Sequence, residues 1–299
     1  MIRLFVIGSS NTDMVVKTQR FPEPGETILG GDFFMFPGGK GANQAVAAAR
    51  AGGAVHFICS VGDDVFGKNA INGYSKEGID VSGVQIIHGK ASGVALITVN
   101  AEGENEIVVA SGTNALLSDD HVHQALKEYK ESAMVLTQLE TPMETLVRLT
   151  EICKNKNWTL ILNPAPAQEL PPEILDGLFL ITPNETEAKL LTGITVADES
   201  SASAAAASLI QMGVKNIIIT MGSKGAFFKN ADESFLISAQ KVKAVDTTAA
   251  GDVFNGVLAV GLAEGLSWKD SILNATKAAA ISVTKMGAQD SAPFKEEFI

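Results

Sequence analysis

The sequence predicts an α/β fold: a doubly wound, mostly parallel central sheet covered by helices on both faces, with a small antiparallel β lid. The first observation behind this prediction is that short apolar runs alternate with helical segments, and each run ends in polar residues or glycine. The second is that the stretches at about 12–37 and 93–110 break the alternation and contain strand-like pieces around Pro, Gly and a polar turn. We expect them to form the lid over the ligand crevice of a single domain, residues 1–299.

Apolar, β-branched runs indicate the strands of the main sheet, in chain order at 3–8, 55–61, 133–140, 158–164, 178–184 and 216–222. Helical segments follow at 41–52, 119–133, 143–157, 185–193 and 201–213, with a long helical stretch from 249 to 286. Several of them begin with Ser, Asp or Thr and end with Gly or Asn, which are the usual start and stop signals of helices. The run KVKAV at 241–245 is strand-like and precedes the last helical stretch.

The composition indicates a globular protein whose ligand is small. The 299 residues are 46% hydrophobic and 19% charged, which provides material for a large core. The formal net charge of −11, without a Lys/Arg-rich run, argues against nucleic acid or an anionic membrane as a partner. We find no signal-peptide pattern and no apolar run of membrane length, so we expect a cytoplasmic protein. Cys59 and Cys153 lie in apolar segments and are expected to be reduced core thiols.

The segment DTTAAGD, residues 246–252, lies between the strand-like run and an apolar helix. The backbone amides of Ala249, Ala250 and Gly251 are therefore expected to be the unpaired donors of a helix N-terminus, which attracts anions. Asp252 could simply cap its own helix. We favour a general base beside an anion hole, because other ligand-like segments occur in the same chain: Asp252 would accept a proton from a hydroxyl that attacks a phosphate bound to those amides.

A glycine-rich turn precedes the first expected helix, in FPGGKGANQAVAAARAG at 36–52. It matches neither the P-loop nor the dinucleotide-binding template. Gly38 and Gly39 would let the backbone approach a ligand closely, and Lys40 and Asn43 would offer hydrogen-bond donors to a polyhydroxy compound.

Polar side chains also follow two of the expected strands. Asn11 and Asp13 come just after the first strand and alternate along the chain, so they can point together into the crevice. Taken singly, each of them is more typical of a local turn residue. Glu140 ends another apolar strand and could be a ligand-binding residue, a solvated acid or a helix cap.

Together the segments GGKGANQAVAAARAG, VGDDVFG, TPNETEA, TMGSKGA and DTTAAGDVFNG resemble the PfkB family of carbohydrate kinases from end to end. Within that family the chain looks like the members that act on ribose. The resemblance implies transfer of the γ-phosphoryl group of ATP to the 5-hydroxyl of D-ribose, with Asp252 as the catalytic base and Ala249 to Gly251 as the anion hole. It implies that ribose is held by Asn11, Asp13, Gly39, Lys40, Asn43 and Glu140.

The same resemblance assigns the nucleotide and the ions. It implies ATP contacts at Asn184, Thr220, Gly222, Ser223, Lys224, Gly225 and Gly251. It implies that Glu187 holds Mg²⁺, largely through water. It implies an activating K⁺ outside the active site, at Asp246, Thr248, Ser282, Lys285, Gly287 and Ser291. From the residues alone, the segment around Asn184 would be a helix start and 223–225 a hairpin turn.

Other functions remain open at the level of the sequence. The chain could be a PfkB kinase for another sugar or a nucleoside, or a sugar-sensing protein without catalysis, although the sensor would have no use for Asp252. A dinucleotide-dependent oxidoreductase is disfavoured, because no G-x-G-x-x-G follows the first strand. Apolar residues on the outer face of the lid, such as Phe33, Val94 and Ile107, would need cover, so we expect a homodimer.

Overall fold

The computed structural model describes residues 2–299 around a nine-stranded sheet of order β13-β12-β11-β10-β9-β8-β1-β4-β5. Its strands are β1 (Arg3–Ile7), β4 (Val55–Gly62), β5 (Val84–Ile87), β8 (Ala133–Thr137), β9 (Thr159–Leu162), β10 (Leu180–Ile181), β11 (Asn216–Thr220), β12 (Ala226–Lys229) and β13 (Ser234–Ile237). Pairing is parallel from β11 through to β5, and only β12 runs antiparallel to its two neighbours, β11 and β13. The predicted mostly parallel sheet is confirmed.

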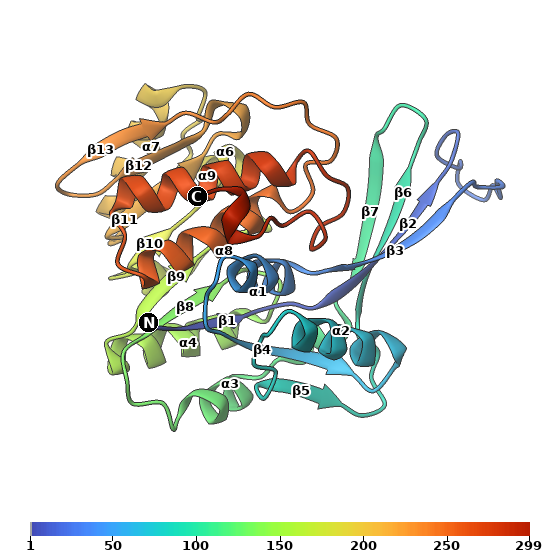
Figure 1. Cartoon of the computed structure of the whole chain (residues 1–299), viewed down its shortest axis with the longest axis horizontal. Coiled ribbons are helices and arrows are strands. Elements are labelled where there is room, and N and C mark those ends of the chain that lie inside the picture. The colour runs from blue at the N-terminus through green and yellow to red at the C-terminus, as the bar shows by residue number, and fades with distance from the viewer. Residues whose placement is uncertain (1) are drawn as a thin grey trace.

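Helices cover both faces of this sheet (Figure 1). They are α1 (Lys40–Arg50), α2 (Val65–Lys76), α3 (Asp119–Leu126), α4 (Met143–Lys156), α5 (Pro172–Leu175), α6 (Glu185–Thr192), α7 (Glu199–Gln211), α8 (Ala250–Ala263) and α9 (Trp268–Ser282). The core on one face takes its helical residues from α1, α2, α8 and α9, and the core on the other face from α3 to α7. Among residues 2–299, no helix combines the length and the apolar character that a membrane crossing requires.

The structure corrects several expected elements. The stretch 249–286 contains two helices, because Gly265 adopts a positive φ of 79° after α8 and reverses the chain. The run 241–245 is not a strand: it pairs with neither sheet, and the amides of Val245 and Asp246 bond to the Val283 carbonyl after α9. Helix α3 ends at Leu126, well before residue 133. Helix α2 was not expected, although the Asp64 side chain caps its N-terminus.

The two insertions form a separate four-stranded sheet, the lid sheet, of order β3-β2-β6-β7. Its strands are β2 (Asn11–Lys17), β3 (Phe33–Gly38), β6 (Gly93–Val99) and β7 (Asn105–Ala110), and they project from the main body (Figure 1). Each insertion contributes an antiparallel pair, and the insertions join through parallel pairing of β2 with β6. The predicted separate small sheet is confirmed. The sequence did not predict its central pairing, the parallel pairing of β2 with β6.

Cross-strand partners lie on the same face of a sheet, so the register separates the two faces of the lid. Asp13 pairs with Phe36 and Ala95. Asn11 lies two residues before Asp13, on the same face of β2, and it is buried against the main body, so this face looks towards the main body. Met14 and its row partners lie on the opposite, outer face. Ile107 is in the row of Val15, on the face of Asp13, so its expected place on the outer face is wrong; Phe33 and Val94 do lie on that outer face.

Candidate active site

The carboxyl ends of the parallel strands meet the N-termini of α1 and α8 at one edge of the main sheet. Asn11 follows β1, Glu140 follows β8 and Asn184 follows β10 along the chain. Lys40 opens α1, and its backbone amide donates to Glu140 Oε2 at 3.0 Å. Open α/β sheets bind ligands at this edge, so the predicted residues lie where the fold provides a crevice.

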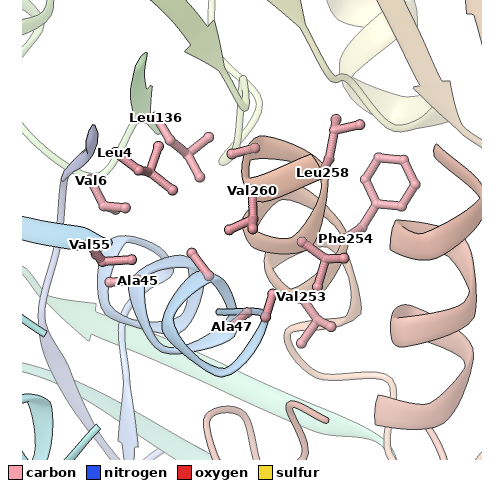
Figure 2. Close-up of a cluster of buried hydrophobic side chains, with 14 of the residues drawn as sticks. Leu4, Val6, Ala45, Ala47, Val55, Leu136, Val253, Phe254, Leu258 and Val260 are labelled. Atoms are coloured by element: carbon pink, nitrogen blue, oxygen red, sulfur yellow. The ribbon is translucent and has the colours of Figure 1, made fainter. Parts of the chain in front are cut away.

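Helices α1 and α8 lie next to each other on β1, with the apolar side chains of both helices packed between them and the sheet (Figure 2). The two helices come close at Gly256, where a Cβ atom would lie 2.6 Å from the Gln44 carbonyl oxygen. Only glycine fits at that position. Asp252 precedes Gly256 by four residues and shares its helix face, so this contact brings the Asp252 carboxylate to the first turn of α1.

The Asp252 carboxylate is buried, with 5% of the residue exposed. Asn43 Nδ2 donates to its Oδ2 at 2.9 Å, and Gln44 Nε2 donates to its Oδ1 at 3.0 Å. Burial raises the pKa of this carboxyl, while the Lys40 ammonium and the two amide donors oppose the increase. Within residues 2–299, none of its hydrogen bonds comes from its own helix, so the geometry does not support a simple helix cap.

The backbone before Asp252 exposes amide donors. Ala249 has φ 60° and ψ 10°, a left-handed conformation that costs energy for a residue other than glycine and is typical of functional loops. Within residues 2–299, the amides of Ala249 and Gly251 donate no hydrogen bond, and Gly251 is exposed. The Ala250 amide donates to the Thr247 carbonyl at 3.3 Å, so the expectation of an unpaired amide is wrong at this position.

Carboxylates surround a single ammonium group in the crevice. Burial raises the pKa of Asp13 to about 6, and the charges of Glu140 and Asp252 add to the shift. Burial alone would lower the pKa of the Lys40 ammonium, but Asp252, Glu140, Glu187 and Asp13 together raise it. The ammonium is therefore held charged among acceptors, an arrangement that suits a ligand rich in hydroxyl groups.

The remaining predicted sugar residues lie beside this cluster. Asn11 is buried, and its Oδ1 accepts from Asn114 Nδ2 at 2.7 Å. Gly39 has φ 90°, and a Cβ atom there would lie 2.7 Å from the Asn11 amide nitrogen, so the turn requires glycine. Asn11 and Glu140 line a cavity of about 570 Å³ beneath Val109 of the lid sheet. The structure thus brings together the residues that the resemblance assigned to ribose.

Two of the segments assigned to the nucleotide lie together, because Asn184, which follows β10, forms a β-bridge with Thr220 at the end of β11. Asn184 and Glu187 form a capping box at the start of α6: Asn184 Oδ1 accepts from the Glu187 amide at 2.8 Å, and Glu187 Oε2 accepts from the Asn184 amide at 2.8 Å. Burial raises the pKa of Glu187. Residues 222–225 form the turn between antiparallel β11 and β12, and Lys224 Nζ donates to the Ala197 carbonyl at 2.7 Å.

The residues assigned to K⁺ are partly brought together. Asp246 accepts from the Thr248 amide at 2.9 Å and from the Gly287 amide at 3.0 Å, which joins the loop before α8 to the loop after α9. The Ser282 and Ser291 hydroxyls donate to nearby carbonyls, and Lys285 Nζ pairs with Glu297 at 2.8 Å. Within residues 2–299, no group of three or more His, Cys, Asp or Glu residues could hold a metal ion.

Comparison with known proteins gives the family. The profile of the pfkB family carbohydrate kinases matches residues 1–295. The chain belongs to this family. A ribokinase from Haemophilus influenzae is 45% identical over 294 residues, which are 98% of this chain and 96% of that protein. A deoxyribokinase from Salmonella typhi is 39% identical over 294 residues, which are also 98% of this chain and 96% of that protein.

A solved structure supports the same assignment. The structure of Arabidopsis thaliana ribokinase complexed with ribose and ATP resembles this chain with a TM-score of 0.91 and 30% identity, over 99% of this chain and 97% of that chain. The predicted family and fold are confirmed, and the chain is a carbohydrate kinase.

Sequence reasoning missed several polar residues of this PfkB kinase. Gln44 contacts the Asp252 carboxylate, and Gln138 and Asn163 contact Gln44. Gln138 and Asn163 come directly after β8 and β9, so the strand-end rule that selected Asn11 could have found them. For Gln44, the only signal in the sequence is its position next to Asn43 in the segment GGKGANQ.

Proposed function

We propose that this PfkB kinase transfers the γ-phosphoryl group of ATP to the 5-hydroxyl of D-ribose, giving D-ribose 5-phosphate and ADP. The observation that carries the proposal is the buried Asp252 carboxylate, which lies beside the unpaired amides of Ala249 and Gly251. Full-length similarity to ribokinases, including one complexed with ribose and ATP, supports the choice of both substrates.

In this reaction the ribose lies among Asn11, Asp13, Lys40, Asn43 and Glu140, with its 5-hydroxyl directed to Asp252. Asp252 takes the hydroxyl proton as the bond from O5 to the γ-phosphorus forms and the bond from that phosphorus to the bridging oxygen of ADP breaks. The free amides of Ala249 and Gly251 stabilise the charge on the transferred group.

Glu187 fits Mg²⁺ bound through water, because its oxygens already accept hydrogen bonds from Asn184 and leave little room for direct coordination. When bound with ATP, the ion supplies positive charge to the phosphate oxygens. The nucleotide itself is assigned to Asn184, Thr220 and the turn at 222–225.

A second candidate substrate comes from the deoxyribokinase at 39% identity, and the cavity of about 570 Å³ also leaves room for a larger sugar or a nucleoside. A coupled assay of ADP release with ribose, 2-deoxyribose, hexoses and nucleosides separates these substrates. We expect the highest kcat/KM with ribose. A higher value with 2-deoxyribose or a nucleoside would reassign the substrate, and binding of sugar without turnover would make the protein a sensor.

We also propose that K⁺ activates the enzyme. Hydrogen bonds from Thr248 and Gly287 lower the pKa of Asp246 although burial opposes this, so the carboxylate stays charged where the two loops meet. The Lys285 ammonium pairs with Glu297 and does not occupy the site. We expect initial rates to rise severalfold when K⁺ replaces Na⁺ at constant ionic strength, since the ion would order the anion-hole loop. Equal rates in both salts would contradict this assignment.

A homodimer through the lid sheet is a further part of the proposal. Met35, Leu96 and Val108 are exposed in one row of the outer face. Light scattering of the purified protein at micromolar concentration should give twice the monomer mass, and Leu96→Glu should give a monomer. Leu273→Glu is the matched control, because Leu273 is exposed on α9, which packs on α8 and β13 of the main body, and its replacement should leave the dimer intact. A monomeric wild type would refute the dimer.

We place the protein in the cytoplasm, where its free and buried Cys59 and Cys153 fit a reducing environment. The net charge of −11 gives no reason to expect nucleic acid or a membrane as a partner.

A further inference from the structure

A buried series of amide side chains connects the base to the ends of the central strands. Gln138 Nε2 donates to Gln44 Oε1 at 2.6 Å. Gln44 Nε2 in turn donates to Asp252 Oδ1 and to Asn163 Oδ1, both at 3.0 Å. Gln44 is completely buried and Gln138 is 1% exposed, so water does not compete for these hydrogen bonds. None of these three amides belongs to the residues assigned to ribose, ATP or an ion.

The order of donors and acceptors fixes the orientation of Gln44. Because Gln44 Oε1 accepts from Gln138, the Nε2 group must face the carboxylate, and the reversed amide would place an oxygen against a negative charge. Asn163 Nδ2 lies 3.4 Å from the Thr182 carbonyl, so its Oδ1 also faces Gln44. Asp252 and Asn163 therefore favour the same orientation of Gln44, with its donor towards Asp252, and its oxygen is then free to accept from Gln138.

Gln44 differs in this respect from Asn43, the other donor to Asp252. Asn43 Oδ1 is buried without a hydrogen-bond partner among residues 2–299, so this side chain has capacity for a sugar hydroxyl. Gln44 has its oxygen and its donor group satisfied inside the protein. The hydrogen bond from Gln44 is thus present whether or not sugar is bound.

Charged groups from several elements face the same carboxylate. Lys40 at the start of α1 stabilises the charged form, while Glu140 after β8, Asp13 on β2 and Glu187 on α6 carry the same charge as Asp252. Burial disfavours the charged form most strongly, and the hydrogen bond from Gln44 is among the interactions that oppose it. Loss of this bond should leave the base protonated at a higher pH.

We propose that Gln44, oriented by Gln138, is a positioning residue for phosphoryl transfer, which holds Asp252 in the rotamer and the charge state that accept the proton of the sugar hydroxyl. The inference rests on the proposed function, in which Asp252 is the base. Gln44 itself does not touch the substrate, so its role should be visible in kcat and in the pH profile and not in sugar affinity.

The test uses Gln44→Met, which keeps the length of the side chain and removes its donor and acceptor. One hydrogen bond to a charged group corresponds to a roughly 10- to 100-fold change, so kcat should fall by about that factor, with the KM for ribose within about threefold of wild type. The acid limb of the profile of kcat against pH should move upward by about one pH unit or more. Gln138→Met should shift both quantities in the same direction by less.

Asn216→Leu is the matched control. Asn216 is a buried amide that bonds to the Phe179 carbonyl at the opposite end of β11, so its loss should lower the melting temperature and leave the acid limb in place. If Gln44→Met does not fold, the kcat and the acid limb of Gln138→Met test the inference instead.

A folded Gln44→Met protein with the wild-type acid limb and kcat overturns the inference, and so does a raised ribose KM with unchanged kcat. Failure of the proposed function is a different result, namely a wild-type protein that releases no ADP with any sugar.

Discussion

Replacing Asp13 with alanine is expected to raise the KM for ribose at least about 100-fold and to leave the KM for ATP within about threefold. The carboxylate lies on the lid face that looks into the crevice, close to Lys40 and Glu140. Hydrogen bonds to a charged group contribute about 1.5–3 kcal/mol each, and we expect Asp13 to accept from two ribose hydroxyls. Initial rates at saturating ATP, with ribose varied, measure the effect, and calorimetry with ATP tests whether the nucleotide site is intact.

Asp13→Asn and pH provide the control for this prediction. The pKa of about 6 means that wild-type Asp13 gains a proton and loses acceptor capacity as the pH falls through 6, so the ribose KM should rise there. Asp13→Asn should abolish that rise.

Because the pKa of Asp13 in the folded protein exceeds the usual value of 3.8, ionisation of Asp13 lowers the stability of the protein as the pH rises from about 4 to above 6. Asp13→Asn should therefore melt no lower than wild type at pH 8, and an unchanged ribose KM in Asp13→Ala would refute the assignment.

The parts of the fold that follow local rules could be predicted from the sequence. Parallel strands buried on both faces are mostly apolar, and all of β4 and β8 is buried, so their positions are visible in the chain. The polar residues after such strands reach one edge by geometry alone, which is why Asn11 and Glu140 could be named. The glycine at 39 marks a backbone conformation that other residues rarely adopt.

The rest depends on contacts between distant segments. The parallel pairing of β2 with β6 decides which lid residues face the crevice, and Ile107 could not be assigned without it. The hydrogen bond from Gln44 to Asp252 requires the close approach of α1 and α8 at Gly256, and no local pattern indicates which glycine of a helix contacts another helix. The strand-like run at 241–245 has the right residues, but the Val245 amide bonds to the Val283 carbonyl after α9 and not to a strand, a contact that no local pattern predicts.

Asp252→Asn should reduce kcat at least about 100-fold in a protein that remains folded. Loss of general-base catalysis typically costs 10²- to 10⁴-fold in rate, about 3 to 5 kcal/mol of barrier, because no other group takes the hydroxyl proton. The substitution keeps the size of the side chain. Its Oδ1 can still accept from Gln44. Its new amide replaces the oxygen that accepts from Asn43 Nδ2, and it can donate to Asn43 Oδ1 once the Asn43 amide turns over. We therefore expect a near-normal melting temperature and near-normal affinities for ribose and ATP by calorimetry.

Asp270→Asn separates this effect from helix capping. Asp252 is the third residue of α8 and Asp270 is the third residue of α9, so both acids lie in the first turn of a helix and interact favourably with its N-terminus. Asp270 bonds with its own N-cap residue, Ser267, whereas Asp252 bonds with α1. Asp270→Asn should change stability by about 1 kcal/mol or less and leave kcat at the wild-type value. If Asp252→Asn behaves in the same way and keeps more than about a tenth of the wild-type kcat, Asp252 is not the base, since a hundredfold loss and a cap effect do not overlap.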